Sequence, residues 1–254
     1  MRVTTLGCNG SITGNLRTTC YQVDGDILID CGTGAGDLSL RQAIAIDTVF
    51  LTHSHLDHCG LLPMLADAAG GFRADPLTVY ALAETIAALK ENMLNGKLWP
   101  DYTRIPTPEH PYIRFKTSAP GESVELNGRR FTALPTRHAV PCAGYCVDNG
   151  AASWVYSGDT THFPEFWQAL NRIGNLRCLL IETTFLNSNA AGAQRAGHMT
   201  AELLAQGLRL LQRPVELYIV HMEAGREEDT LREIMHAARD FRPIPLERGQ
   251  VFEF

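Results

Sequence analysis

The sequence lacks the features that mark membrane, secreted and nucleic-acid-binding proteins. No window of its 254 residues approaches the roughly 18 to 20 consecutive apolar residues of a membrane span, and its first residues, MRVTTLGCNGS, hold no apolar core of signal-peptide length. Its 22 lysines and arginines are outnumbered by 28 aspartates and glutamates, which disfavours a broad electrostatic grip on nucleic acid or anionic lipid. We therefore expect a cytoplasmic protein with neither a membrane nor a nucleic acid as its partner.

The sequence also has no disulfide pattern and no internal boundary. The cysteines are odd in number and include no C-x-x-C pair, so we expect them to be reduced and mostly buried in strands. They are Cys8, Cys20, Cys31, Cys59, Cys142, Cys146 and Cys178. No repeat, low-complexity tract or linker rich in Pro, Gly and Ser divides the chain, so a single domain over residues 1–254 is predicted.

The order of apolar patterns predicts an α/β fold. The first thirty residues have strand character, with Asp24-Gly25 as a hairpin turn, and strand and helix patterns alternate after them. Later strands are predicted at 47–52, 77–81, 123–136, 143–148, 153–158, 178–183 and 215–220. Helices are predicted after Gly60 and at 82–94, 163–173, 200–212 and 227–241, and the leucines of the 200–212 segment form one apolar stripe that belongs to the core.

Polar residues with metal-binding chemistry follow the carboxyl ends of four predicted strands. These residues are His53, His138, Asp159 and His221. Ligands of open α/β sheets bind in the crevice beyond the carboxyl ends of the strands, so we expect these four loops to converge in space.

The densest cluster is the run THSHLDH at 52–58, which holds His53, His55, Asp57 and His58. Burying three imidazoles and a carboxylate without a cation is costly, and this is the ligand set that zinc and similar divalent ions prefer. One tetrahedral ion cannot take all of these ligands and also those of the distant loops. Two ions that share ligands are therefore predicted, an arrangement used for displacement at phosphorus and for other hydrolyses.

These motifs, in this order, resemble the metallo-β-lactamase superfamily of di-metal hydrolases. The resemblance runs from LIDCG (28–32) through THSHLDH, His138 and SGDT (157–160) to His221. It implies a four-layer αββα sandwich of two mixed sheets with the metal site at one edge. It further implies His53, His55 and His138 as ligands of one ion, and Asp57, His58 and His221 as ligands of the other, with Asp159 bridging.

Within the superfamily, the chain is most similar to the class II 3′,5′-cyclic-nucleotide phosphodiesterases. His55 stands where thioester hydrolases tend to carry glutamate, and LNGKLWPDYTRIP (94–106), LLIETTF (179–185), GHMTAELL (197–204) and YIVHMEAG (218–225) add to the likeness. The chain departs from the class after His221, where Met222 and Glu223 replace an expected lysine. Arg226 is close enough in sequence to substitute for it.

The resemblance implies hydrolysis of cAMP or cGMP to the 5′-nucleotide. A hydroxide bridging two ions, with zinc first and manganese or iron as alternatives, would attack phosphorus in line with O3′. Asp57 would orient that hydroxide and His198 would protonate the leaving oxygen. Trp99 and Tyr102 are predicted either to stack on the base or to pack over the site, and Thr200 and Arg226 are further candidate substrate contacts.

Two other functions are compatible with the same motifs. A tRNA 3′-processing endonuclease shares the metal motifs and a histidine like His198, although the acidic composition disfavours it. A non-catalytic metal- or ligand-binding protein is the alternative from another class, and the complete set of ligands disfavours that. The resemblance also implies a homodimer.

Overall fold

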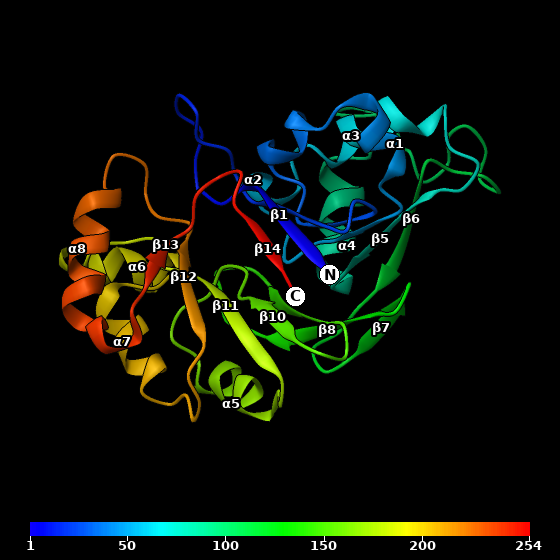
Figure 1. The fold of residues 1–254 in the computed structure, drawn as a ribbon. Helices are drawn as coiled ribbons and strands as arrows, with labels where there is room; N and C mark the ends of the chain where they lie inside the picture. The colour runs from blue at the N-terminus through cyan, green and yellow to red at the C-terminus, as the bar shows by residue number, and fades with distance from the viewer. The chain divides into compact units, whose positions relative to one another are not determined.

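The computed structural model describes all residues, 1–254, and the chain divides into two compact units (Figure 1). Unit 1 comprises residues 1–8, 14–119 and 248–253, and unit 2 comprises residues 9–13, 120–247 and 254. Each unit has its own sheet and its own helices, and the single domain over 1–254 stays a prediction. None of the helices combines the length and apolarity that a membrane span requires.

Unit 1 contains a seven-stranded mixed sheet in the order β14-β1-β2-β3-β4-β5-β6. The strands from β14 to β3 pair antiparallel and those from β3 to β6 pair parallel. Their bounds are β1 Arg2–Gly7, β2 Cys20–Val23, β3 Ile27–Ile29, β4 Thr48–Phe50, β5 Leu77–Ala81, β6 Ile113–Thr117 and β14 Val251–Glu253. The predicted turn at Asp24-Gly25 joins β2 to β3, and both of its residues have positive φ, as a tight hairpin requires.

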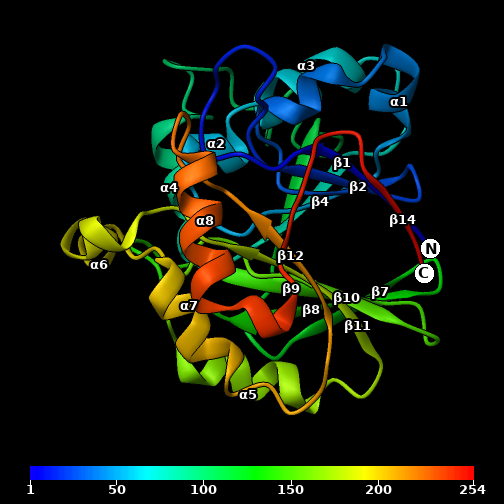
Figure 2. The same ribbon diagram turned by 60° about the vertical axis from the view of Figure 1, so that its left-hand side comes forward.

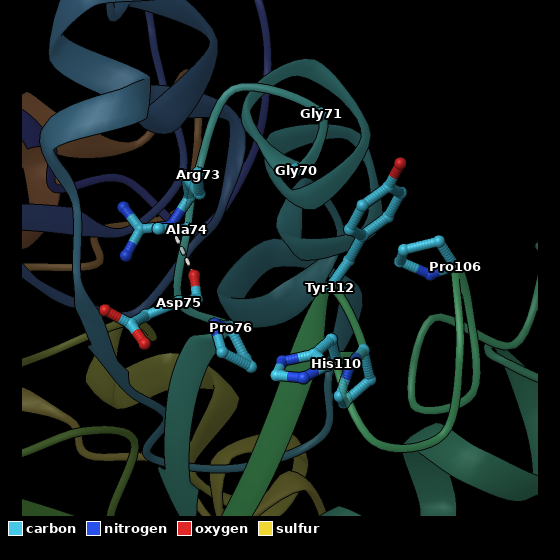
Figure 3. A pocket seen from close by; sticks show the side chains of 10 residues that line it. Gly70, Gly71, Arg73, Ala74, Asp75, Pro76, Pro106, His110 and Tyr112 are labelled. Carbon is cyan, nitrogen blue, oxygen red and sulfur yellow. Dashed lines mark hydrogen bonds between the residues drawn. The ribbon is translucent and has the colours of Figure 1, made fainter.

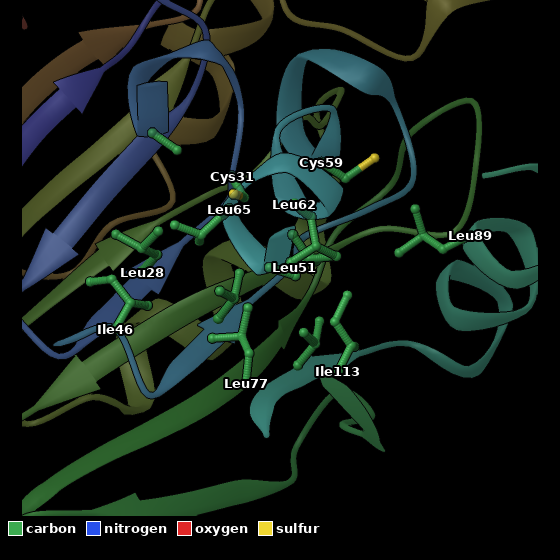
Figure 4. Close-up of a cluster of buried hydrophobic side chains, with 14 of the residues drawn as sticks. Leu28, Cys31, Ile46, Leu51, Cys59, Leu62, Leu65, Leu77, Leu89 and Ile113 are labelled. Carbon is green, nitrogen blue, oxygen red and sulfur yellow. The ribbon is translucent and has the colours of Figure 1, made fainter. Parts of the chain in front are cut away.

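The helices of unit 1 are α1 Leu40–Ala45, α2 Leu56–Cys59, α3 Leu62–Gly70 and α4 Ala83–Asn92, with a 3-10 turn η1 at Thr33–Asp37. A capping box starts α1, in which Ser39 accepts from the Gln42 amide and the Gln42 side chain accepts from the Ser39 amide. The apolar sides of α1, α3 and α4 pack on one face of the sheet, around Leu28, Leu51 and Leu77 (Figure 4). This core supports the loops that leave β3 and β4.

Unit 2 contains a second seven-stranded mixed sheet, in the order β13-β12-β11-β10-β9-β8-β7. The strands from β7 to β10 pair antiparallel and those from β10 to β13 pair parallel, which repeats the pairing pattern of unit 1. Their bounds are β7 Ser123–Leu126, β8 Arg129–Pro135, β9 Ala143–Asp148, β10 Ser153–Tyr156, β11 Leu176–Glu182, β12 Glu216–Val220 and β13 Ile244–Pro245.

The helices of unit 2 are α5 Pro164–Arg172, α6 Ala190–Ala196, α7 Ala201–Leu208 and α8 Glu227–Ala237, with 3-10 turns η2 at Asn187–Asn189 and η3 at Arg239–Phe241. Helices α5, α7 and α8 pack together on one face of the sheet (Figure 2). Trp167 of α5 is fully buried against Gly207 of α7, where any side chain larger than hydrogen would overlap the indole ring.

The α/β prediction is confirmed, and the elements that sequence reasoning missed are short or at sheet edges. They are β6, β13, β14, α1, α2 and α6. Helix α7 ends at Leu208 rather than at 212, because Leu210 and Leu211 donate to carbonyls only three residues back and the chain leaves the helical path. All seven cysteines are free and buried as predicted, but only Cys20, Cys146 and Cys178 lie in strands.

Candidate metal centre

In each unit, candidate ligands follow strands that point in the same direction. In unit 1, Asp30 follows β3 and the run from His53 to His58 follows the parallel strand β4. In unit 2, β8, β10 and β12 all run in one direction, and they are followed by His138, Asp159 and His221 respectively. Three of the four predicted loops, those of His138, Asp159 and His221, thus end at the same edge of the unit 2 sheet, and the fourth, that of His53, belongs to unit 1.

The four ligands of unit 1 form two pairs. The ring centroids of His53 and His55 lie 4.6 Å apart, and a ligand atom of one residue lies within 4.8 Å of a ligand atom of the other. Nε2 of His58 lies 3.4 Å from Oδ2 of Asp57. Helix α2 holds the second pair, because Asp57 and His58 belong to its single turn and His55 is its N-cap residue.

A buried carboxylate orients the histidines of unit 1. Nδ1 of His58 lies 2.7 Å from Oδ2 of Asp30, and both side chains are fully buried. Thr52 bonds the same carboxylate through its amide and its hydroxyl, and its Oγ1 lies 3.0 Å from Nδ1 of His53. Burial raises the pKa of Asp30, whereas His58 and Thr52 lower it, and the net shift is upward.

The candidate ligands of unit 2 are centred on Asp159. Its Oδ2 lies 3.8 Å from Nε2 of His138, and its Oδ1 lies 3.5 Å from Nε2 of His221. Each oxygen of one carboxylate thus faces a different imidazole, so the three side chains place four candidate donor atoms close together. Asp159 is 1% exposed, so this arrangement has almost no water around it to screen its charge.

The second nitrogen of each of these imidazoles has an acceptor of its own. Nδ1 of His138 lies 3.1 Å from the carbonyl oxygen of Gly197, and Nδ1 of His221 lies 3.1 Å from the hydroxyl oxygen of Thr184. When Nδ1 carries the proton, the lone pair of a neutral ring is on Nε2, facing the carboxylate of Asp159. Two electron-rich atoms face each other favourably only with a cation between them, so this donor set fits a divalent metal.

His221 is held in an uncommon backbone conformation. Its φ is 60°, in the left-handed region that residues with a Cβ seldom adopt. The hydroxyl of Thr184 donates to the His221 carbonyl oxygen at 2.8 Å, and Gly10 lies flat against the ring, where an added Cβ would be 2.6 Å from Cε1. The conformation depends on both neighbours.

His198 lies beside two of the candidate ligands of unit 2, and its action on a substrate stays a prediction. Its ring is 4.7 Å from the ring of His138 and stacks on that of His221 at 5.5 Å between centroids. Its Nδ1 lies 2.9 Å from Oε1 of Glu182, a fully buried carboxylate that also accepts from the amides of Thr160 and Thr184. This contact holds a proton on Nδ1 and orients the ring.

The four candidate substrate contacts lie in different settings. Tyr102 is buried in the core of unit 1 and donates its hydroxyl to Asp67, and burial followed by that bond raises the pKa of Tyr102 to about 12. Trp99 packs against the same core. Thr200 is the N-cap of α7, and Arg226 is exposed at the start of α8. Contact of these residues with a substrate stays a prediction.

Sequence reasoning did not single out five residues that shape these ligands: Asp30, Thr52, Glu182, Thr184 and Gly10. Asp30 stands within LIDCG, and Glu182 and Thr184 within LLIETTF, so the signal was a polar residue at the end of an apolar strand. Gly10 carried no comparable signal, because its role depends on a ring more than 200 residues away in sequence.

A surface hollow of unit 1 contains none of these residues. It is lined by the end of α3, the segment after it and residues around His110 and Tyr112 (Figure 3). Its arginine, Arg73, donates to the carbonyl oxygens of Ile44 and Ile46 and to Asp47. The guanidinium therefore ties the segment after α3 to the loop before β4.

Comparison with known proteins yields one family and several remote relatives. A family described as "Beta-lactamase superfamily domain" matches residues 26–222. A probable 3′,5′-cyclic-nucleotide phosphodiesterase of Yersinia pestis is 26% identical over 188 residues, covering 66% of this chain and 52% of that protein. A ribonuclease Z of Agathobacter rectalis is 32% identical over 133 residues, covering 48% of this chain and 39% of that protein. The matched part thus spans about half, or less, of these two relatives.

The solved structures include a close match in fold. The structure of unliganded yeast PDE1 superposes with a TM-score of 0.80 at 17% identity and covers 98% of both chains. At that identity the likeness concerns the fold alone. Together with the family match, it confirms the predicted fold class, two mixed sheets flanked by helices.

Proposed function

The chain belongs to the metallo-β-lactamase superfamily, and on that basis we propose that it is a metal-dependent phosphodiesterase that converts 3′,5′-cyclic nucleotides to 5′-nucleotides. The observation that carries the proposal is His198, an imidazole anchored by the buried Glu182 and packed against the rings of His138 and His221. A protonated imidazole beside metal ligands suits the departure of an alkoxide, which needs a proton. The relative from Yersinia pestis supports the choice of substrate.

The proposed site holds two divalent ions. Following the superfamily pattern, His53, His55 and His138 would hold one ion, and Asp57, His58 and His221 would hold the other, with Asp159 available to both. Support comes from the geometry inside each unit: Asp57 faces Nε2 of His58, and the two oxygens of Asp159 face two different imidazoles. Imidazole and carboxylate donors accept zinc first, and manganese or iron as alternatives.

In the proposed reaction, different residues of the chain orient the attacking water and protonate the leaving oxygen. When bound, the ions lower the pKa of water and draw charge from the phosphoryl oxygens. Asp57 orients the attacking water through its carboxylate, in line with the bond from phosphorus to O3′. His198 delivers a proton to O3′ as that bond breaks, and Glu182 keeps the ring in place while it does so. Zinc as the native metal and a homodimeric assembly are parts of the same proposal.

A ribonuclease Z activity is the second candidate. It is favoured by the ribonuclease Z relative, whose identity to this chain is comparable to that of the phosphodiesterase. The net charge of −6 disfavours it, because a tRNA substrate presents many phosphates to the surface. A non-catalytic metal-binding protein on this fold is the third candidate.

One panel of substrates separates the three candidates. Purified protein reconstituted with zinc, manganese or iron is assayed with cAMP, cGMP, bis(p-nitrophenyl) phosphate and a pre-tRNA, and products are resolved by chromatography. Formation of 5′-AMP or 5′-GMP supports the proposal. Cleavage of the pre-tRNA without cyclic-nucleotide hydrolysis identifies the ribonuclease. Two bound ions without any hydrolysis identify the binding protein.

A further inference from the structure

Glu182 contacts the imidazole of His198 directly and is linked to the imidazole of His221 through Thr184. Its Oε1 accepts directly from Nδ1 of His198, whereas its Oε2 lies 3.0 Å from the hydroxyl of Thr184. That hydroxyl oxygen lies 3.1 Å from Nδ1 of His221 and 3.3 Å from Nδ1 of His198. Glu182 and His221 are therefore linked through one side chain, and Thr184 provides the only hydroxyl among the partners of this carboxylate.

Two protons matter for the contact between His221 and Thr184: the ring proton of His221 and the hydroxyl proton of Thr184. If Nε2 of His221 binds one of the proposed ions, the neutral ring carries its proton on Nδ1 and donates it to Thr184 Oγ1. The single hydroxyl proton of Thr184 then goes to Glu182 or to the His221 carbonyl oxygen, which lie 3.0 Å and 2.8 Å away. A bond to Glu182 fixes the hydroxyl oxygen that faces the His221 ring, and a bond to the carbonyl oxygen restrains the strained backbone of His221.

Unit 1 contains the same arrangement of a buried carboxylate and a threonine hydroxyl beside two imidazoles. Asp30 contacts Nδ1 of His58 directly at 2.7 Å, and Thr52 Oγ1 lies 2.9 Å from Asp30 and 3.0 Å from Nδ1 of His53. One buried carboxylate and one threonine hydroxyl thus orient two imidazoles in each unit. The pairs differ in one respect: both imidazoles of unit 1 are proposed metal ligands, whereas in unit 2 one is a ligand and the other is the proposed proton donor.

We propose that Thr184 is a positioning residue that couples the metal ligand His221 to the proton donor His198 through their common carboxylate, Glu182. This inference rests on the proposed function for the role of His198. Loss of the hydroxyl removes the acceptor of the His221 ring proton and one restraint on the backbone at φ 60°. It also removes one of the donors to Oε2 of Glu182, which keeps the amides of Thr184 and Met199, so the carboxylate that orients His198 is less constrained.

The test compares three variants of the full chain. Thr184→Val keeps the branched shape and removes the hydroxyl, and Thr184→Ser keeps the hydroxyl. Thr230→Val is the matched control, because the Thr230 hydroxyl is fully buried in unit 2 and bonds to nothing. Zinc affinity is measured by competition with a chelator, and kcat is measured at saturating zinc with cAMP, cGMP and bis(p-nitrophenyl) phosphate.

Thr184→Val is expected to lose affinity for one of the two ions by about 10- to 100-fold, with Thr184→Ser and Thr230→Val close to the wild type. At saturating zinc, its kcat should fall further for cyclic nucleotides than for bis(p-nitrophenyl) phosphate, whose nitrophenolate leaves without needing a proton. Zinc affinity equal to that of Thr230→Val overturns the proposal. Equal losses of kcat on all substrates overturn the coupling to His198.

The zinc affinities test the role of Thr184 independently of whether the proposed function is correct. If the wild type hydrolyses no cyclic nucleotide, the proposed function fails, and the zinc affinities still decide whether Thr184 positions His221. If Thr184→Val does not fold, ¹⁵N-edited spectra of the zinc-loaded wild type decide the same point. A proton on Nδ1 of His221 supports the link, and a proton on Nε2 overturns it.

Discussion

Nδ1 of His198 lies 2.9 Å from Oε1 of Glu182, and the two residues come from the end of β11 and from the turn between α6 and α7. The glutamate is fully buried, whereas the His198 side chain keeps 12% of its surface exposed. A buried anion against one nitrogen stabilises the charged ring and directs its other nitrogen away from the protein anchor. This relationship underlies the first two predictions.

Removal of the His198 imidazole should impair chemistry without removing metal. His198→Ala is expected to lower kcat for cyclic nucleotides by about 10²- to 10⁴-fold, the range for loss of a general acid, with zinc content unchanged. Steady-state kinetics and metal analysis by mass spectrometry check this. A variant that loses zinc in parallel with activity would show that His198 is a ligand instead.

Neutralising Glu182 should loosen His198 and also destabilise unit 2. In Glu182→Gln the side-chain amide nitrogen must face a backbone N–H or the His198 ring, because the partners of this carboxylate donate to it. We expect a loss of about 1–3 kcal/mol in the free energy of unfolding, measured in urea, and a lower kcat. Unchanged stability and kcat would contradict the described role of Glu182.

A methyl group at Gly10 should displace a proposed ligand. In Gly10→Ala the new Cβ would lie 2.6 Å from Cε1 of His221, closer than carbon atoms pack. Zinc affinity is expected to fall by about 10-fold or more, as after other shifts of a ligand. Gly174→Ala is the control, because an added Cβ there meets nothing within 4 Å. Equal zinc affinity in the two variants would count against this prediction.

Gly207→Ala should destabilise the protein although alanine is the better helix former. Alanine gains up to about 1 kcal/mol in helix propensity, but its methyl group would overlap the buried indole of Trp167. Overpacking of this kind costs about 1–3 kcal/mol, so we expect a net loss of stability by urea denaturation. A more stable variant would mean that α5 can move away from α7.

The cysteines should resist alkylation in the folded protein at pH 8. Burial raises the pKa of Cys59 and of Cys146 to about 12, and it also raises the pKa of Cys20, Cys31 and Cys178. These thiols stay protonated at pH 8, and the thiolate is the reactive form. Mass spectrometry after iodoacetamide should show labelling of these five only once denaturant is added, and rapid native labelling would contradict their burial.

Much of the fold was predictable because its signals are local. The β5 strand at Leu77–Ala81 has the predicted bounds, and β9 to β12 lie where runs of apolar residues predicted them. The missed elements lacked such runs. Strand β6 at Ile113–Thr117 has alternating character but two charged residues and mostly exposed side chains, and β13 has only two residues. Their pairing comes from the neighbouring strand rather than from their own composition.

The sequence by itself determined the kind of chemistry, because four ligating residues within 53–58 and three more at strand ends have few uses other than metal binding. Only the tertiary structure decided what holds those ligands in place. Glu182 and His198 are 16 residues apart, Thr184 and His221 are 37 apart, and Gly10 meets His221 from the other end of the chain. Such contacts depend on how strands pair and where loops return. A hydrogen bond between distant residues leaves no periodic pattern in the sequence.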